Sequence, residues 1–272
     1  MIPDKLTADY SENYKVSIRL MPDGLSFFGY IPAEKDSFFM EKFFFNQELS
    51  TVDALKNIIF TNACFSYTYR SFHVICVSEK YTMVADHVFV EQEKDRLFTF
   101  CHQKDKSLKV FAQPLKTLNT FILFGIDEDV YAFLLRSLAN PVFVHSLSPL
   151  LNAWHKKSLA VSCKLMHVVL RESVMDVLCI EQGDLLFLNS YDFDGDNDVL
   201  YYIMYICKQT GFNQLEDYLT ISGEQSRCQS AVSVINKYIK RVDYLQPVLE
   251  GYRVALNDEL PLDVIALIEC GL

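Results

Sequence analysis

Apolar and polar positions follow one order twice along the chain: a short strand, a polar turn, a helix and another strand. In the second half, the apolar run Leu185–Leu188 precedes an acidic turn, and the apolar run Val199–Cys207 precedes Gly211. A helix of that length is expected to end at such a glycine, which accepts the left-handed backbone that closes many helices. The short apolar run Tyr218–Ile221 predicts the strand that follows.

The first half predicts the same block. The run Phe43–Phe45 has strand character, and Ala54–Phe60 has the period of a helix. Ser50 and Asp53 have the spacing of a capping box, so we expect the Asp53 carboxylate to reach back to the Ser50 amide. The β-rich run Phe72–Cys76 predicts the strand after this helix.

Each block is preceded by a predicted meander of three antiparallel strands. In the first half the expected strands are Lys15–Leu20, Leu25–Ile31 and Ser37–Phe45, with a turn at Pro22-Asp23-Gly24. In the second half they are Leu159–Leu170, Val174–Ile180 and Asp184–Leu188, with a turn at Gln182-Gly183.

Matching positions recur at a nearly constant spacing; Asn46 and Asn189, for example, lie 143 residues apart (189 − 46). Val16-Ser17 and Val161-Ser162 lie 145 residues apart (161 − 16), and so do Glu79 and Glu224 (224 − 79). We therefore predict a duplicated unit of about 65 residues that forms two lobes. The expected lobes are residues 1–145, with an irregular insertion near 79–109, and residues 146–272.

The rest of the pattern completes the two lobes. Further strands are expected at Lys109–Gln113, Thr120–Phe124, Pro141–His145 and Arg241–Leu245. Further helices are expected at Asp127–Leu138, Ser146–Lys156, Arg227–Ile239 and Pro261–Glu269, the last with Asp258 as its cap and Gly271 as its stop. Because apolar residues occupy every face of Val199–Cys207, we expect that helix to be buried all round.

Composition excludes several classes of protein. Half of the 272 residues are apolar, which is enough for a substantial core. The net charge of −10 and the lack of a Lys/Arg cluster interleaved with aromatic residues argue against a nucleic-acid partner. The sequence shows no signal peptide and no transmembrane run, and its eight cysteines form no C-x-x-C pair. We therefore expect a cytoplasmic protein with reduced, buried thiols and no membrane insertion.

The acidic turn Asp192–Asp198 allows two more specific interpretations, both of which involve a metal ion. Asp192-x-Asp194-Gly195 after an apolar strand resembles the haloacid dehalogenase signature, which implies a magnesium-dependent phosphohydrolase with Asp192 as nucleophile and Asp194 as acid/base. Asp196 stands where that signature has Thr. An EF-hand needs its glycine sixth and a glutamate twelfth, whereas Gly195 is fourth and Ile203 is twelfth. We expect a capping turn and no metal.

The duplicated order of strands and helices resembles the actin-like ATPase superfamily, a branch of the ribonuclease H-like fold. Locally the chain resembles an uncharacterised Bacteroidetes family assigned this fold, at Asn189, which we place at the opening of a helix, at the capped helix Val199–Gly211, and at Leu219–Glu224. The resemblance implies an α+β (α/β) fold with two lobes built from duplicated β-β-β-α-β-α units.

Active members of that superfamily carry an Asp-x-Gly element in each lobe's hairpin and a Gly-Gly element at the adenosine. The places that we match to these elements read Ser17-Ile18-Arg19, Ser162-Cys163-Lys164 and Ser222-Gly223-Glu224. The resemblance therefore implies a degenerate nucleotide cleft at Ser17, Arg19, Ser162, Lys164, Ser222, Gly223 and Glu224. A Glu side chain would repel a nucleotide phosphate where the second glycine is lost.

These departures predict a pseudo-ATPase without catalytic residues, cofactor or metal, which acts with a protein partner in assembly. A homo-oligomer is compatible with the sequence. The first alternative is an actin-like member that still binds nucleotide through the Gly223 region. The second alternative is the phosphohydrolase built on Asp192 and Asp194.

Overall fold

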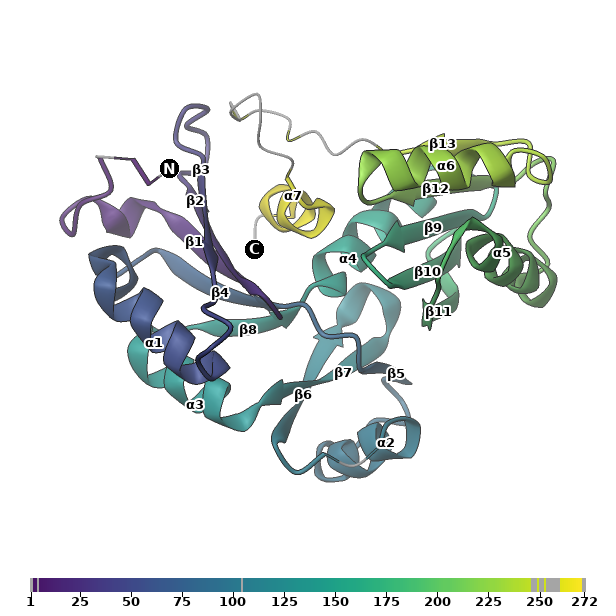
Figure 1. Ribbon diagram of the computed structural model, residues 1–272. Coiled ribbons are helices and arrows are strands. Elements are labelled where there is room, and N and C mark those ends of the chain that lie inside the picture. Colours follow the sequence, from purple (N-terminus) through teal and green to yellow (C-terminus); the bar gives the residue numbers. More distant parts are fainter. Residues whose placement is uncertain are drawn as a thin grey trace. The chain divides into compact units, whose positions relative to one another are not determined.

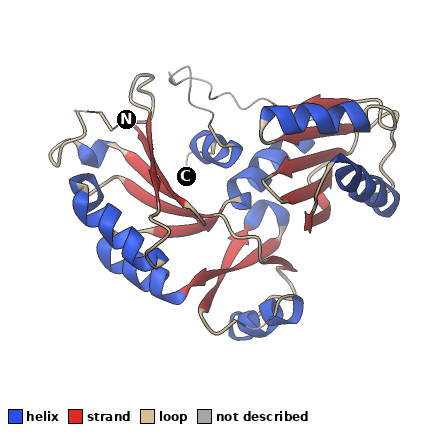
Figure 2. Ribbon diagram, in the orientation of Figure 1, coloured by secondary structure: helices blue, strands red, loops and turns tan. Residues whose placement is uncertain are grey.

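The computed structural model describes residues 2–3, 5–103, 105–245, 249, 252 and 260–270 (Figures 1 and 2). Its strands are β1 (Lys15–Met21), β2 (Gly24–Tyr30), β3 (Phe39–Phe44), β4 (Ser71–Cys76), β5 (Tyr81–Ala85), β6 (Leu108–Leu115), β7 (Thr120–Asp127), β8 (Val142–His145), β9 (Leu165–Leu170), β10 (Val174–Glu181), β11 (Asp184–Asp192), β12 (Tyr218–Ser222) and β13 (Val242–Tyr244). Its α-helices are α1 (Thr51–Thr61), α2 (Lys94–Cys101), α3 (Glu128–Ser137), α4 (Leu147–Ser158), α5 (Asp196–Thr210), α6 (Gln225–Ile235) and α7 (Leu262–Glu269).

Two five-stranded sheets repeat one strand order, β3-β2-β1-β4-β8 and β11-β10-β9-β12-β13. Each combines an antiparallel meander with two parallel strands, so the expected mixed α/β class and the duplication are confirmed. Lys15 pairs with Tyr30, and Leu165 pairs with Ile180. Both partners differ by 150 (165 − 15 and 180 − 30), so the expected spacing of 145 is wrong for this hairpin.

The spacing was wrong because the expected strand Leu159–Leu170 begins too early. Helix α4 continues to Ser158, the residues after it form turns, and β9 starts only at Leu165. Leu159 and Val161 imitate a strand in the sequence but are 61% and 38% exposed. The opposite error affects β11, which continues to Asp192 and places Asn189 inside the strand instead of at the start of a helix.

The insertion in the first half is longer and more regular than expected. Between β4 and α3 the chain forms β5, α2, β6 and β7, and the three strands pair in the order β5-β7-β6. Val84, Phe98, Val110 and Leu123 form its small core. Neither β5 nor α2 was expected, because β5 has only five residues and α2 begins with the charged residues Lys94, Asp95 and Arg96.

The contacts divide the chain into two compact units. Unit 1 comprises the described residues of Met1–Pro114, Phe121–Ser146 and Leu249–Asp258. Unit 2 comprises the described residues of Leu115–Thr120, Leu147–Val248 and Glu259–Leu272. The lobe limits of 1–145 and 146–272 stay a prediction.

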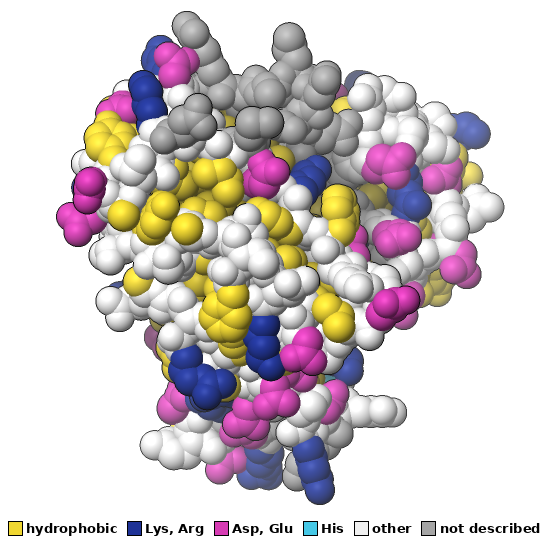
Figure 3. Space-filling model, turned by 60° about the vertical axis from the view of Figure 1, so that its left-hand side comes forward, with side chains coloured by type: hydrophobic (Ala, Val, Ile, Leu, Met, Phe, Trp, Pro, Cys, Tyr) yellow, Lys and Arg dark blue, Asp and Glu magenta, His cyan; other side chains and the backbone are white. Residues whose placement is uncertain are grey.

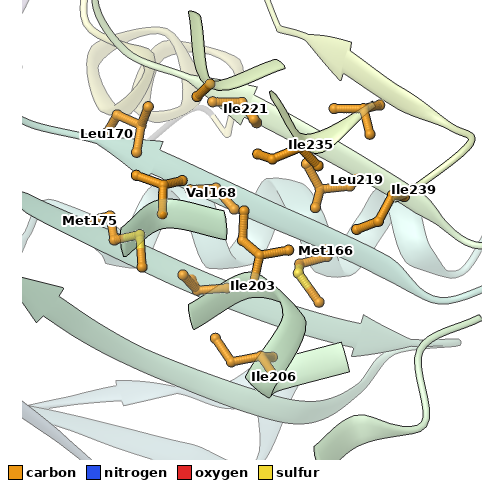
Figure 4. Close-up of a cluster of buried hydrophobic side chains, with 14 of the residues drawn as sticks. Met166, Val168, Leu170, Met175, Ile203, Ile206, Leu219, Ile221, Ile235 and Ile239 are labelled. Atoms are coloured by element: carbon orange, nitrogen blue, oxygen red, sulfur yellow. The ribbon is translucent and has the colours of Figure 1, made fainter. Parts of the chain in front are cut away.

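In unit 2, helices α5 and α6 cover one face of the sheet (Figure 4). The core between them includes Met166, Val168, Ile203 and Ile235, each at most 1% exposed. Helix α5 buries only one face, so the expectation that it is buried all round is wrong. Its other face carries Tyr201 and Tyr205, which are 65% and 46% exposed.

The helix ends follow the capping chemistry of the sequence. Ser50 Oγ accepts the Asp53 amide at 3.2 Å, while the Asp53 carboxylate accepts the Ser50 hydroxyl at 2.8 Å instead of reaching the Ser50 amide. Gly211 ends α5 with φ 63°. The expected cap and stop of α7, Asp258 and Gly271, lie outside the described residues. Within the described part of the chain, no helix is long and apolar enough to cross a membrane.

Candidate functional site

The hairpin between β9 and β10 is held by a buried ion pair. Arg171 Nη2 lies 2.7 Å from Asp176 Oδ2, and the Asp176 side chain is only 4% exposed. The Ser190 hydroxyl donates to the same carboxylate from β11. A buried carboxylate is tolerated when it is paired and hydrogen-bonded, so these three residues tie the hairpin to its neighbouring strand.

Gly223 lies directly beside this hairpin, because the end of β12 approaches the end of β9. Its φ is 141°, and a Cβ atom added here would lie 2.3 Å from the carbonyl oxygen of Leu170. Only glycine fits such a position without strain. The surviving glycine of the expected adenosine element is therefore required by backbone packing within unit 2.

Helix α6 closes the same corner. Arg227 Nη1 donates to the Arg171 carbonyl at 3.0 Å and also to the Glu172 carbonyl. Glu224 is the N-cap residue of α6 and accepts a hydrogen bond from the Ser226 hydroxyl. A carboxylate thus already stands at the positive end of the helix, where a phosphate would otherwise bind favourably.

The structure groups some of the expected cleft positions and separates others. Ser222 is buried and donates to the Val168 carbonyl at 3.4 Å, next to Gly223. Ser162 and Lys164 precede β9 and do not belong to its hairpin. Lys164 Nζ lies 3.5 Å from Glu181 at the opposite end of β10, so these two positions do not join the Gly223 corner.

In unit 1, Ser17 and Arg19 lie inside β1, which continues to Met21. Ser17 is 3% exposed and is the register partner of His73 in β4. The hairpin itself turns at residues 22 and 23, and a Cβ atom on Gly24 would lie 2.2 Å from the Phe43 carbonyl oxygen. This glycine also serves backbone packing.

The position that matches Ser17 in unit 2 is His167 (17 + 150). His167 is the register partner of Thr220 and shares a hydrogen bond with the Thr220 hydroxyl. Its ring stacks on Trp154 at 4.5 Å with an interplanar angle of 6°. Burial, and then the nearby Lys157, lower the pKa of His167 to about 3, so this imidazole is a neutral core group.

The acidic turn serves as the start of α5. The Asp194 amide donates to Asp198 Oδ2 at 3.0 Å, and the Ser230 hydroxyl donates to Asp196. Asp192 belongs to the end of β11. Among the described residues, no group of three His, Cys, Asp or Glu side chains could hold a metal ion. The geometry fits the capping role better than either metal-dependent alternative.

Several cysteine thiols are buried in the core, which disfavours the reactive thiolate form. All eight are free thiols, and five of them are buried. Burial raises the pKa of Cys179 to about 11 and that of Cys207 to about 12. The expectation of buried thiols is wrong for Cys101 and Cys270, which are exposed.

An open groove of about 620 Å³ lies between the first turns of α1 and α3 in unit 1. Two of its three carboxylates, those of Asp127 and Asp53, are already used within the protein. Asp127 accepts the amides of Asp129 and Val130 as the cap of α3, and Asp53 accepts Lys56 at 2.8 Å. The groove therefore offers few uncommitted polar groups to a ligand.

The Arg171, Asp176 and Ser190 cluster was missed by the sequence analysis. A usable signal was present, since Asp176 is a single carboxylate within the apolar strand Val174–Glu181 and Arg171 lies across its hairpin. Cross-strand placement of Ser190 depends on the register of β11, which local patterns do not fix.

Comparison with known proteins identifies the fold and the family. A solved protein from Bacteroides thetaiotaomicron, described as having an actin-like ATPase fold and unknown function, is 30% identical, with a TM-score of 0.84 over 99% of this chain and 100% of that chain. The PilM–PilN type IV pilus biogenesis complex matches 95% of this chain and 98% of that chain at 9% identity and a TM-score of 0.57. This chain therefore has the actin-like ATPase fold.

No protein with a curated description matches this chain. The family model described as "Protein of unknown function (DUF3822)" matches residues 3–242, which is most of the sequence. The chain therefore belongs to this DUF3822 family.

Proposed function

We propose that this protein is an actin-like protein that does not hydrolyse nucleotide and that acts through contacts with a protein partner. The observation that carries the proposal is that Gly223 and Arg227, beside the β9–β10 hairpin, are already in contact with the backbone of that hairpin. The glycine faces the Leu170 carbonyl, and Arg227 donates to hairpin carbonyls. Groups that could receive a phosphate are thus engaged with the protein's own backbone.

The corner is also unfavourable for an anion. Arg171 is neutralised by Asp176, and Glu224 stands at the N-terminus of α6. Neither hairpin of the two sheets has an Asp-x-Gly sequence at its turn, where the chain reads Met21-Pro22-Asp23-Gly24 in unit 1 and Arg171-Glu172-Ser173 in unit 2. The unit 2 turn has no glycine, and Gly24 in unit 1 is packed against the Phe43 carbonyl oxygen, so the backbone is not open to a phosphate there.

The interaction role is supported by large apolar side chains at the surface. Phe44, Phe60, Phe100 and Tyr201 are between 65% and 90% exposed. On the face drawn in Figure 3, hydrophobic side chains lie between Lys, Arg, Asp and Glu side chains of both signs. Exposed aromatic residues are typical of protein interfaces. An assembly role is an analogy to the pilus biogenesis complex, which shares only the fold.

A thermal-shift assay with ATP, ADP and magnesium tests the non-nucleotide part of the proposal. A ligand at about a hundred times its dissociation constant adds about 2.7 kcal/mol to stability. For a chain of this size, that corresponds to a rise of roughly 5–10 °C in the melting temperature. We expect no rise beyond that given by magnesium alone. A rise of several degrees with either nucleotide would contradict the proposal.

The interaction part is tested by affinity purification of the tagged full chain from its native cells, followed by reconstitution with any protein recovered. We expect the two purified proteins to form a complex, and the amount of that complex to be the same with and without ATP. A complex that needs ATP would favour the nucleotide-binding alternative.

A further inference from the structure

The outer edge of β11 ends the sheet of unit 2. Among the strands that the structure describes, β11 pairs with β10 and with no other. The Phe193 amide donates to the Ser173 carbonyl at 3.0 Å, which fixes the ladder so that Phe187, Asn189 and Tyr191 direct their backbone groups to β10. The backbone of the residues between them is directed outward. Consistent with this, the Ser190 amide donates to the side chain of Asn189 at 3.0 Å.

A cluster of tyrosines lies along this edge. Tyr191 of β11 stacks on Tyr202 of α5 at 4.3 Å between ring centroids, and Phe187 lies 6.5 Å from Tyr191. Tyr201 meets Tyr202 edge to face at 5.3 Å, and its side chain is 65% exposed. Tyrosine rings provide large, rigid contact area at interfaces, so the exposed face of α5 is suited to cover a segment added beside β11.

Charge decides between two kinds of occupant. Asp184 and Asp192, at the two ends of β11, are both exposed. A second copy would bring its own Asp184 and Asp192 to this edge, so pairing of the two identical strands would bring acidic ends together. Like charges brought together in this way repel each other. The edge therefore disfavours a second copy and favours a segment with positive side chains.

We propose that the edge of β11 and the tyrosine face of α5 bind an extended, basic segment of a partner protein, which adds a sixth strand to the five-stranded sheet. This inference rests on the proposed function and names the surface and the chemical class of the partner. Alternate apolar side chains of the segment pack on the tyrosines, and its Lys or Arg side chains on the opposite face meet Asp192. Asp184 lies on the tyrosine face, because the register of β11 shifts beside Cys179 and Ile180, and it meets a basic side chain at the end of the segment.

Synthetic peptides test this proposal on the full chain by isothermal titration calorimetry. The first probe is a peptide of about eight residues, the length of one strand, that alternates Lys and Val. The matched probes are the same peptide with Glu in place of Lys, and the Lys peptide with alternate amides N-methylated. We expect binding of the Lys peptide alone, because the Glu peptide is repelled and the methylated peptide cannot pair with β11.

Variants of the protein locate the binding. We expect the double variants Asp184→Asn with Asp192→Asn, and Tyr201→Ala with Tyr205→Ala, each to weaken binding of the Lys peptide by roughly tenfold. Tyr238→Ala is the matched control, because this tyrosine is 52% exposed but lies outside β11 and α5. We expect it to bind as the unmodified protein does, and thermal unfolding checks that every variant is folded.

Three results would overturn the proposal: no binding of the Lys peptide to the unmodified protein, equal binding of the Glu or methylated peptide, or equal binding by all variants. Dimerisation that is abolished by Leu188→Pro would also overturn it, in favour of a second copy. If no peptide binds but a partner complex forms equally with and without ATP, the edge of β11 is not the binding surface and the proposed function still stands.

Discussion

The two five-stranded sheets have the same strand order, but their first hairpins are stabilised by different chemistry. Unit 2 uses the buried pair of Arg171 and Asp176. The matching positions in unit 1, 150 residues earlier, are Met21 and Ser26, and Ser26 is 2% exposed. The shared topology therefore does not depend on any one polar group.

The cores differ in the same way. In unit 1, Phe27 is fully buried and lies 5.4 Å from Phe39 and 4.8 Å from Phe65 between ring centroids. In unit 2, the matching face is filled by aliphatic and sulfur-containing side chains such as Met166 and Ile203. Cores tolerate such exchange when volume and patterning are kept, so duplication of the fold leaves little duplication of sequence.

The largest expected effect comes from breaking the ion pair. Asp176→Ala leaves the half-buried Arg171 without its carboxylate, and we expect a loss of about 3–5 kcal/mol in the free energy of unfolding. Ser26→Ala, at the matching position of unit 1, breaks no ion pair and should cost about 1 kcal/mol. Urea denaturation of both variants gives the comparison.

A double variant sharpens this difference. Arg171→Met with Asp176→Ser installs the pair of unit 1 in unit 2, and it should recover most of the stability lost in Asp176→Ala, because no charge is left buried. Equal losses in Asp176→Ala and Ser26→Ala would contradict the account of the two hairpins.

Substitution of Gly223 or Gly24 should have an intermediate effect on the free energy of unfolding. Gly223→Ala combines a Cβ placed 2.3 Å from the Leu170 oxygen with a φ of 141°. We expect a loss of about 2–4 kcal/mol from overpacking and backbone strain together. Gly24→Ala meets a similar approach, 2.2 Å from the Phe43 oxygen, but without a positive φ. Its loss in urea denaturation should be smaller, and the reverse order would contradict the strain argument.

The smallest effect concerns pH. Burial lowers the pKa of His167 to about 3, whereas the unfolded residue titrates near 6.5. Between these values the unfolded state binds more protons, so stability falls as the pH falls from 6.5, by at most about 1.4 kcal/mol per pH unit. We expect His167→Gln to flatten this slope between about pH 6.5 and 5. Burial also lowers the pKa of His73 in unit 1, which is less enclosed, so His73→Gln should change the slope less. An unchanged slope in His167→Gln would contradict this assignment.

The sequence predicted those parts of the fold that local chemistry decides. The helix expected at Asp127–Leu138 is α3, with Asp127 as its cap, Gly211 ends α5, and Gln182-Gly183 turns the β10–β11 hairpin with φ values of 47° and 93°. The start of β9 could not be predicted, because Leu159 and Val161 have the apolar pattern of a strand while their side chains stay exposed. Periodicity reports apolar character and does not report burial.

The candidate site was predictable only in part. Gly223 was recognised as the surviving glycine of its element, but the reason for it, the Leu170 carbonyl, is a contact between strands far apart in sequence. Ser162 and Lys164 were matched to the wrong place because the spacing of the repeat was taken from residues before β9. The cluster around Asp176 required the register of three strands, which no local signal provides.

Hydrogen exchange at both hairpin ends, measured with and without millimolar ATP and magnesium, tests whether nucleotide binds to either hairpin. We expect unchanged exchange for residues 20–26, 170–176 and 222–228, because their backbone groups are already engaged within each unit. Slower exchange at residues 222–228 or at either hairpin on addition of ATP would show that a nucleotide binds there, and would contradict the account.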